Sequence, residues 1–224
     1  SGTYPKSPKN YLLINENGKF IDQTDKIAPG LSEVGMVTSA SWVDLNGDKK
    51  SELIVVGEWM PIKIYEYKQG KLVNVSEDYG LASTEGWWNK VIADDLDGDG
   101  DLDLILGNLG ENYKFKASKE KPFQIFAKDF DNNGTNDVFL ARYIQDTLLV
   151  PIRGRECTSL QMPVIGQKFP TYLSFATSDL PSILGKDIEK AMHYKAHLFS
   201  SVILTNEKGQ LVMKKLPVEA QLST

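Results

Sequence analysis

Three short stretches of the sequence concentrate side chains that could ligate a metal ion. Residues 44–52, 95–103 and 129–137 hold eleven of the thirty Asp and Glu residues. A tight loop with acids on alternate residues can supply the roughly six to eight oxygen ligands that Ca²⁺ takes. Positions 1, 3, 5 and 9 of each stretch carry a side-chain oxygen: Asp44, Asn46, Asp48 and Glu52; Asp95, Asp97, Asp99 and Asp103; Asp129, Asp131, Asn133 and Asp137.

Positions 6 and 7 of each stretch fit the same interpretation. Position 7 would offer its backbone carbonyl, so its side chains can differ: Lys50, Asp101 and Thr135. Position 6 is Gly100 in the second stretch and Gly134 in the third, which permits a left-handed turn. The first stretch departs at Lys49 and Glu52, so we expect its metal site to be weaker or empty, and a plain acidic turn is its alternative. We expect calcium in the other two, with dissociation constants on the order of 10⁻⁴–10⁻³ M.

The residues after each stretch exclude the commonest calcium motif. An EF-hand has Glu at position 12 and a helix on each side. Here position 12 is apolar, as Val55, Leu106 and Leu140. The apolar runs that follow are β-branched or aromatic in character, so the stretches are predicted to be loops between strands.

The chain also repeats itself at a period near 50 residues. Asp44 and Asp95 are 51 residues apart, and residues 18–24 resemble residues 70–76 after a step of 52. Short strands at such a period are typical of propeller blades. Within one unit we predict strands near 36–43, 53–58, 61–67 and 70–75, with hairpin turns at 15–18 and 68–70. The third stretch begins only 34 residues after the second and interrupts the period.

Residues 157–197 have a different texture. Leu180, Ile183, Leu184 and Ile188 follow helical spacing, and residues 178–181 read as a helix start. We expect two or three short helices here and a return to strand at 198–204. The predicted domains are therefore 1–152 with the loops, 153–197 as a helical insertion, and 198–224 as returning strands.

Two histidines in this region are candidates for a different metal. His193 and His197 lie four residues apart and could share zinc on a helix. Tyr194 stands where a metalloprotease has Glu, and no third ligand is evident. We expect no zinc site.

Composition limits the classes of partner. The chain has 224 residues, 25 basic and 30 acidic, with a net charge of −5. This balance disfavours non-specific nucleic-acid binding. No apolar run approaches the roughly 18 residues of a membrane span, and the single Cys157 excludes an internal disulfide.

Two motifs together carry a family resemblance. The first is Asn-x-Leu-x-x-Asn-x-x-Gly-x-Phe-x-x-x-Thr at residues 10–24, and the second is Asp-x-Asp-Gly-Asp-Gly-Asp-x-Asp-Leu at residues 95–104. They resemble the FG-GAP/VCBS repeats of integrin-α-like and cartilage-acidic-protein-like β-propellers, and the chain is similar to VCBS-repeat proteins common in Bacteroidetes. The resemblance implies a mainly β fold, a partial propeller of three to four blades with a short helical insertion. It further implies a non-catalytic, calcium-stiffened scaffold for a protein or glycan ligand, in an exported, cell-surface or periplasmic protein.

Other interpretations stay open at this stage. Trp87 and Trp88 could stack on sugar rings, or they could fill the space between blades. A calcium-dependent polysaccharide lyase is the alternative function, because metal can neutralise a uronate carboxylate while a basic residue removes the neighbouring proton.

The repeat count bears on completeness. At a period near 51, with about 40 residues in helices, the chain holds roughly three and a half blades, and closed propellers have about four to eight. The chain opens at residues 11–14 with a late-blade pattern and closes at 216–224, where the family would continue. We therefore expect a fragment whose signal sequence lies upstream. Its unpaired outer strands would self-associate or lie under helices.

Overall fold

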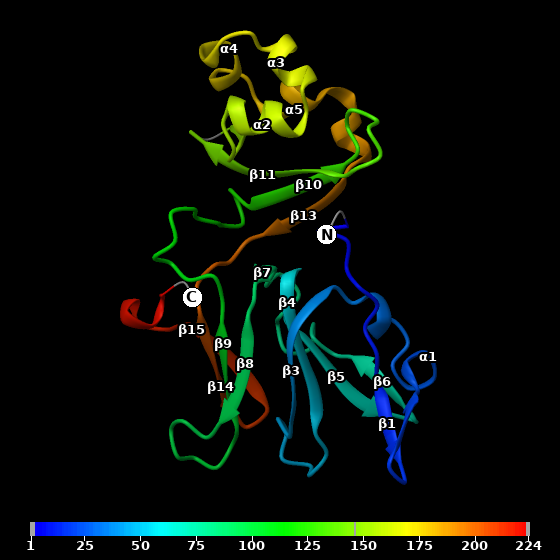
Figure 1. Cartoon of the computed structure of the whole chain (residues 1–224). Coiled ribbons are helices and arrows are strands. Elements are labelled where there is room, and N and C mark those ends of the chain that lie inside the picture. The colour runs from blue at the N-terminus through cyan, green and yellow to red at the C-terminus, as the bar shows by residue number, and fades with distance from the viewer. Residues whose placement is uncertain (1–2, 146, 223–224) are drawn as a thin grey trace. The chain divides into compact units, whose positions relative to one another are not determined.

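The computed structural model describes residues 3–145 and 147–222 (Figure 1). The chain divides into two compact units. The repeat unit comprises residues 7–114 and 198–224, and the inserted unit comprises residues 1–6 and 115–197. The boundaries between the two units fall at 114/115 and 197/198, whereas the domain boundaries predicted from the sequence lie at 152/153 and 197/198.

The repeat unit is built from antiparallel strands. Its first sheet has five strands, with β3-β4-β5-β6 in chain order and the short β7 beside β4. Its second sheet has four strands in the order β8-β9-β14-β15. A separate hairpin joins β1 and β2. The strands are β1 (Leu13–Glu16), β2 (Lys19–Asp22), β3 (Met36–Val43), β4 (Glu52–Met60), β5 (Lys63–Lys68), β6 (Lys71–Asn74), β7 (Gly86–Trp87), β8 (Lys90–Asp94), β9 (Asp103–Gly107), β14 (Val202–Glu207) and β15 (Gln210–Lys215). Short helical turns are α1 (Thr24–Ile27), η1 (Leu31–Glu33) and η3 (Val218–Ala220).

The predicted strands of the first sheet are confirmed. The expected strand at 36–43 coincides with β3, and the other three lie within a few residues of β4, β5 and β6. The expected strand at 198–204 begins later, because β14 starts at Val202. The period breaks because residues 115–197 lie between the second and third strands of the β8-β9-β14-β15 sheet.

Three hairpins of the repeat unit share one turn geometry. The turns at 17–18, 69–70 and 208–209 each place two consecutive residues at positive φ, between 51° and 87°. Positive φ at both central residues defines the type I′ turn, which matches the twist of paired strands. Glycine as the second residue of each turn adopts this conformation without a Cβ penalty. The turns predicted at 15–18 and 68–70 are thereby confirmed.

The core of the repeat unit explains the long apolar run in β4. Its two faces contribute to two separate clusters, with Ile54 and Val56 in one and Leu53 and Val55 in the other. Trp88 is fully buried in the first cluster, and its Nε1 donates to the Thr84 carbonyl at 3.0 Å. Of the two interpretations left open for Trp88, core packing agrees with the structure, and stacking on a ligand does not fit a fully buried indole.

The inserted unit combines a sheet with a helical layer. The sheet order is β12-β11-β10-β13, and the helices pack on one of its faces around Phe126 and Phe139. Its elements are β10 (Phe123–Lys128), β11 (Asp137–Ile144), β12 (Leu148–Pro151), α2 (Arg155–Gln161), α3 (Val164–Lys168), α4 (Tyr172–Ala176), α5 (Leu180–Leu184), η2 (Gly185–Lys190) and β13 (Met192–Ala196). The predicted helix start is confirmed, since Asp179 caps α5 by accepting the Ser182 N–H at 2.8 Å.

The histidine pair lies in a strand region and not on a helix. His193 belongs to β13, and His197 directly follows that strand. The His193 ring stacks on Phe126 with centroids 4.1 Å apart, and its Nε2 hydrogen-bonds Gln124 Oε1 at 2.8 Å. The helical placement of these residues was wrong, because cross-strand pairing with β10 outweighs the local pattern.

The sheets of the described chain stay open. Their outer strands include β3, β6, β8 and β15, and no sheet closes on itself within residues 3–145 and 147–222. Self-association through such edges stays a prediction. In the same part of the chain, none of the helices has the length and apolar character that crossing a membrane requires.

The packing of β8 and β9 generates a stability prediction. Leu106 is 0% exposed in the core, whereas Ile92, on the paired strand, is 51% exposed. Leu106→Ala should lower the free energy of unfolding by about 2–5 kcal/mol through lost burial and a cavity. Ile92→Ala is the matched control and should change it by about 0.5 kcal/mol or less. Urea unfolding of both variants measures this, and equal losses would contradict the described core.

Candidate metal centres

Each acidic stretch forms the connection of a β-hairpin. The first, second and third loops (44–52, 95–103 and 129–137) join β3 to β4, β8 to β9 and β10 to β11. The residue before position 1 pairs with position 9 in every case: Val43 with Glu52, Asp94 with Asp103, and Lys128 with Asp137. One register thus positions all three sets of side chains.

The carboxylate at position 1 closes each loop. Asp44 accepts the N–H groups of positions 4 and 6 at 2.8 and 2.9 Å. Asp95 accepts the corresponding pair at 2.8 and 3.1 Å. Asp129 accepts from positions 5 and 6 at 3.0 and 2.8 Å. Position 1 therefore fixes the curl of the loop through both of its oxygens.

Positions 3 and 5 repeat a second pattern. The side-chain oxygen of position 3 accepts the N–H of position 5 at 2.9, 3.2 and 3.2 Å in the three loops. The oxygen of position 5 accepts the N–H of position 7 at 2.8, 2.9 and 2.9 Å. Local side-chain to backbone bonds of this kind compete with regular secondary structure and favour a turn. They hold successive oxygens on the inside of one curl.

The backbone at position 6 is left-handed in all three loops. Gly100 and Gly134 have φ of 96° and 88°, and Lys49 has φ of 65°. Lys49 thus accepts a conformation that costs a residue with a Cβ on the order of 1 kcal/mol. The first loop keeps the same fold as the others. The expectation of a weaker first site now depends on charge, since Lys49 adds a cation and Asn46 replaces an acid.

The carboxylate at position 9 is the buried end of each loop. Glu52, Asp103 and Asp137 are each 1% exposed. Each accepts the N–H of position 2 through one oxygen, at 2.9, 3.1 and 3.0 Å respectively. Burial raises the pKa of Glu52 and of Asp137, and the neighbouring carboxylates of the same loop raise each pKa further. A bound cation would relieve this penalty.

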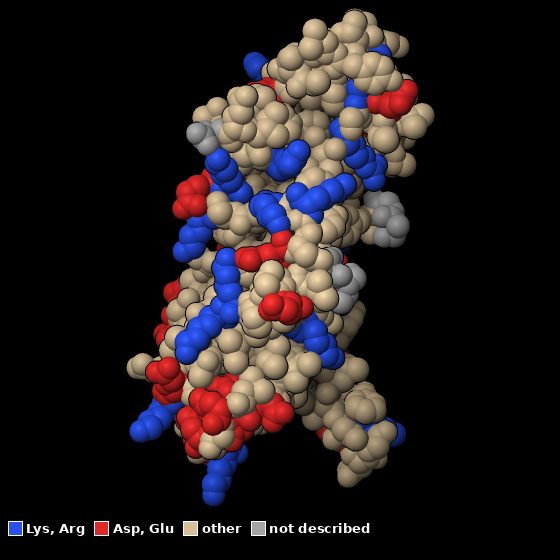
Figure 2. Space-filling model, turned by 90° about the vertical axis from the view of Figure 1, so that its left-hand side faces the viewer, with Lys and Arg blue, Asp and Glu red and all other residues tan. Residues whose placement is uncertain are grey.

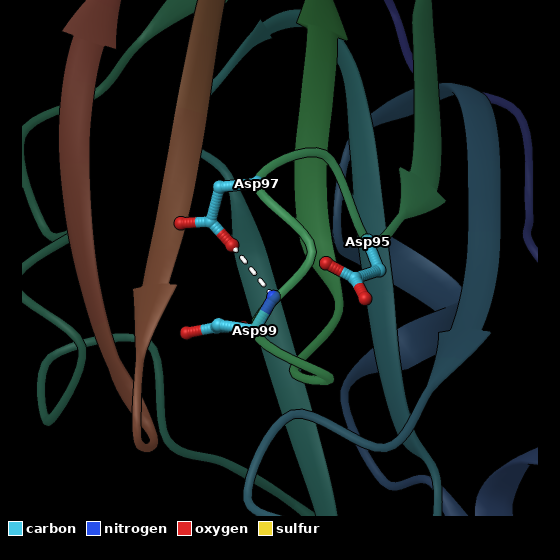
Figure 3. A group of neighbouring side chains, drawn as sticks. All are labelled: Asp95, Asp97 and Asp99. Atoms are coloured by element: carbon cyan, nitrogen blue, oxygen red, sulfur yellow. Dashed lines mark hydrogen bonds between the residues drawn. The ribbon is translucent and has the colours of Figure 1, made fainter.

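Two loops gather three carboxylates closely enough to share one ion. Ligand oxygens of Asp95, Asp97 and Asp99 lie within 4.8 Å of one another, and so do those of the set Asp129, Asp131 and Asp137. Figure 3 shows the first set around the curl of the second loop, with the Asp99 N–H directed at Asp97. The first loop forms no such group of acids in the described chain.

The ligand chemistry of these loops points to a hard cation. Their side-chain donors at positions 1, 3, 5 and 9 are carboxylate or amide oxygens, without His or Cys. Oxygen-only donor sets suit calcium or magnesium and not zinc or copper. Figure 2 shows acidic side chains gathered at the lower end of the face it presents, where the second loop lies.

The other predicted binding residue lies elsewhere. Trp87 is half-buried, and its ring centroid lies 5.0 Å from that of Trp59. The backbone N–H of Trp87 donates to Asn108 Oδ1 at 3.0 Å. Its ligand-binding role stays a prediction.

One residue in contact with the loops was not predicted. Asn206 of β14 is buried, and its N–H donates to Asp103 Oδ1 at 2.8 Å. The sequence feature that could have identified Asn206 is the Asn-x-x-Gly pattern of residues 206–209, which repeats that of residues 15–18.

Comparison with known proteins agrees with this geometry. Residues 44–106 match a family model described as FG-GAP-like repeat. The match begins at position 1 of the first loop and ends in β9, so it includes the first and second loops. A search of curated proteins found no match.

Burial of position 9 predicts an unusual pH dependence of the metal-free protein. The raised pKa of Glu52 means that the folded state binds its proton more tightly than the unfolded state, where the pKa is about 4.3. Stability from this group is present at low pH and is lost as pH rises through the folded pKa. Glu52→Gln should therefore raise the melting temperature at pH 7 without metal, and the gain should vanish toward pH 4.

A carboxylate of opposite behaviour provides the control. Hydrogen bonds from Ser182 lower the pKa of Asp179, the residue that caps α5. The stabilising effect of Asp179 is therefore present at neutral pH and is lost on acidification. Asp179→Ala should cost about 1 kcal/mol at pH 7 and less at pH 4. Thermal melts in EDTA from pH 4 to 7 compare the two, and a Glu52→Gln protein less stable than wild type at pH 7 would contradict the assignment.

Proposed function

We propose that this chain, which carries an FG-GAP-like repeat at residues 44–106, is a non-catalytic calcium-binding module of a β-propeller. The observation that carries the proposal is the common geometry of the three loops. Their backbone N–H groups orient the side-chain oxygens of positions 1, 3 and 5 in the same way, and position 9 is buried in each. Because three separate loops repeat nearly the same hydrogen bonds, we infer that each binds the same kind of ligand and that they are not three unrelated acidic turns.

Calcium would be held by the loop residues themselves. In the second loop these are Asp95, Asp97, Asp99 and Asp103, and in the third Asp129, Asp131, Asn133 and Asp137, with the position-7 carbonyl of Asp101 or Thr135 in each. When bound, the ion would neutralise like charges that otherwise repel across a few ångströms. The buried acid at the start of the return strand and the more accessible acids of the loop would then ligate one ion. The expected effect is a stiffer hairpin end.

The propeller part of the proposal is supported by the repeat unit. Its two larger sheets are antiparallel, and each contains four strands in an up-and-down order, β3-β4-β5-β6 and β8-β9-β14-β15. Both have the metal loop between the first two strands and a type I′ turn between the last two. Such sheets are the units of propeller blades. The β1–β2 hairpin, with the same turn, would be the outer half of a further blade.

The setting and partner follow from the same proposal. Weak sites of this design fill at the millimolar calcium found outside cells, so we infer an exported or cell-surface parent protein. The module would act as a scaffold that presents a binding face to a protein or glycan. A parent protein found only in the cytosol by fractionation of the native organism would contradict this location.

Calcium binding is tested by calorimetry on matched variants. Wild type should bind at least two calcium ions. Asp97→Ala/Asp99→Ala and Asp131→Ala/Asn133→Ala should each lose one ion, because they remove ligand oxygens at positions 3 and 5. Calcium at 100 times its dissociation constant should add about 2.7 kcal/mol per site to the free energy of unfolding.

A control and an activity assay complete this test. Asp25→Ala removes an exposed acid outside the loops and should leave both binding and the EDTA-induced drop in melting temperature unchanged. Binding of no calcium by wild type would overturn the proposal. Calcium-dependent release of unsaturated products from uronate polymers would instead make the chain a lyase.

A further inference from the structure

A single buried side chain is hydrogen-bonded toward both loops of the repeat unit. Asn206 of β14 is 1% exposed. Its backbone N–H donates to Asp103 Oδ1 in the second loop at 2.8 Å, and its Nδ2 donates to the Leu45 carbonyl in the first loop at 2.8 Å. These partners are 103 and 161 residues away in sequence.

The orientation of the Asn206 amide is fixed by its remaining partners. Oδ1 accepts the Gly209 N–H at 2.8 Å, so the NH₂ group must face the opposite side. Its second proton is directed to the Leu102 carbonyl at 3.2 Å. Every polar atom of this side chain is therefore engaged. A buried polar group held in this way is rigid and costly to displace.

The link continues to the buried acids at position 9. Leu45 is position 2 of the first loop, and its N–H donates to Glu52 Oε2 at 2.9 Å. The series Asp103, Asn206, Leu45, Glu52 thus joins position 9 of the second loop to position 9 of the first. All four residues are 1% exposed. Hydrogen bonds between buried groups are stronger than those in water, and bonds in a connected series polarise one another.

The hairpin that carries Asn206 contacts the second loop at another point. The Lys208 N–H, in the β14–β15 turn, donates to Asp101 Oδ2 at 3.2 Å. The second loop therefore contacts this hairpin at positions 7, 8 and 9, through Asp101, Leu102 and Asp103. The first loop contacts it at Leu45, through the Asn206 amide.

We propose that Asn206 couples the two loops, so that calcium in the second loop orders the first loop and raises its affinity for the metal. The inference rests on the proposed calcium function. Calcium and the Asn206 N–H would both hold the Asp103 carboxylate in one orientation. A fixed Asp103 holds Asn206, which holds Leu45 and with it the buried Glu52. The first loop, with fewer acids and Lys49 at position 6, depends most on this support.

Amide hydrogen exchange of the full chain tests the coupling, with calcium as the only probe. The N–H groups of Leu45, Gly47 and Lys49 report on the first loop, and those of Gly98 and Gly100 report on the second. In wild type, calcium should slow exchange in both loops. Asp97→Ala/Asp99→Ala, which leaves Asn206 and the first loop untouched, should raise the calcium midpoint of first-loop protection about fivefold or more, a typical allosteric coupling.

Asn206→Ala separates the link from the ligands. It removes the amide's contacts with Leu45 and Leu102 but keeps the backbone N–H to Asp103 and the Lys208 N–H to Asp101. The first-loop midpoint should therefore rise by a similar factor, while the second-loop midpoint stays within twofold. Combining it with Asp97→Ala/Asp99→Ala should add no further shift. Asn15→Ala is the matched control, because Asn15 caps the equivalent turn through Gly18 at 2.8 Å on an exposed hairpin, and it should behave as wild type.

The outcomes distinguish the coupling from the calcium function itself. If calcium protects both loops but the first-loop midpoint is unchanged in Asp97→Ala/Asp99→Ala, the coupling is overturned and the calcium proposal stands. That variant alone decides the question should Asn206→Ala fail to fold. If calcium slows exchange in neither loop of wild type, the calcium proposal falls and the coupling falls with it.

Discussion

The burial of one carboxylate at the start of each return strand is the constraint on which the described structure depends. Glu52, Asp103 and Asp137 are withdrawn from solvent at the point where a hairpin turns back. Burial raises the pKa of Glu52 and of Asp137, and acids of the same loop raise each pKa further. Removing an ionised carboxylate from water is costly unless it is compensated by hydrogen bonds or by a cation. Each of the three accepts the backbone N–H of position 2, and Asp103 also accepts the N–H of Asn206, but these hydrogen bonds compensate only in part. A cation bound in the loop would supply the remaining compensation for the buried carboxylate.

The same constraint explains how the loops relate to the rest of the repeat unit. A buried acid fixes the register of its hairpin, because a slip of one residue would move it to the opposite face of the sheet. In the second loop the fixed acid also receives the N–H of Asn206, so a strand that follows the insertion is joined to one that precedes it. The sheet can thus be interrupted by residues 115–197 and still pair β9 with β14.

Much of this arrangement could be predicted from the sequence, and the limits have physical reasons. The loops, the first sheet and the two predicted hairpin turns depend on local patterns, namely alternate acids, apolar runs and Asn-Gly or Gln-Gly steps, and these patterns are visible along the chain. The place of the insertion and the role of Asn206 depend on pairing between residues about 100 apart, which no local pattern encodes. The sequence left Trp88 open between ligand stacking and core packing, because the burial of a side chain depends on contacts that are distant in the chain. His193 follows β10 and not its own helical spacing, because cross-strand pairing is a long-range effect.

The most direct test of the account is a crystal structure of the protein grown in millimolar calcium, with anomalous scattering used to locate the ions. The account predicts a calcium peak inside the second loop, ligated by Asp95, Asp97, Asp99 and Asp103, and a second peak inside the third loop, ligated by Asp129, Asp131, Asn133 and Asp137. A well-ordered structure at that calcium concentration with both loops free of anomalous density would contradict it.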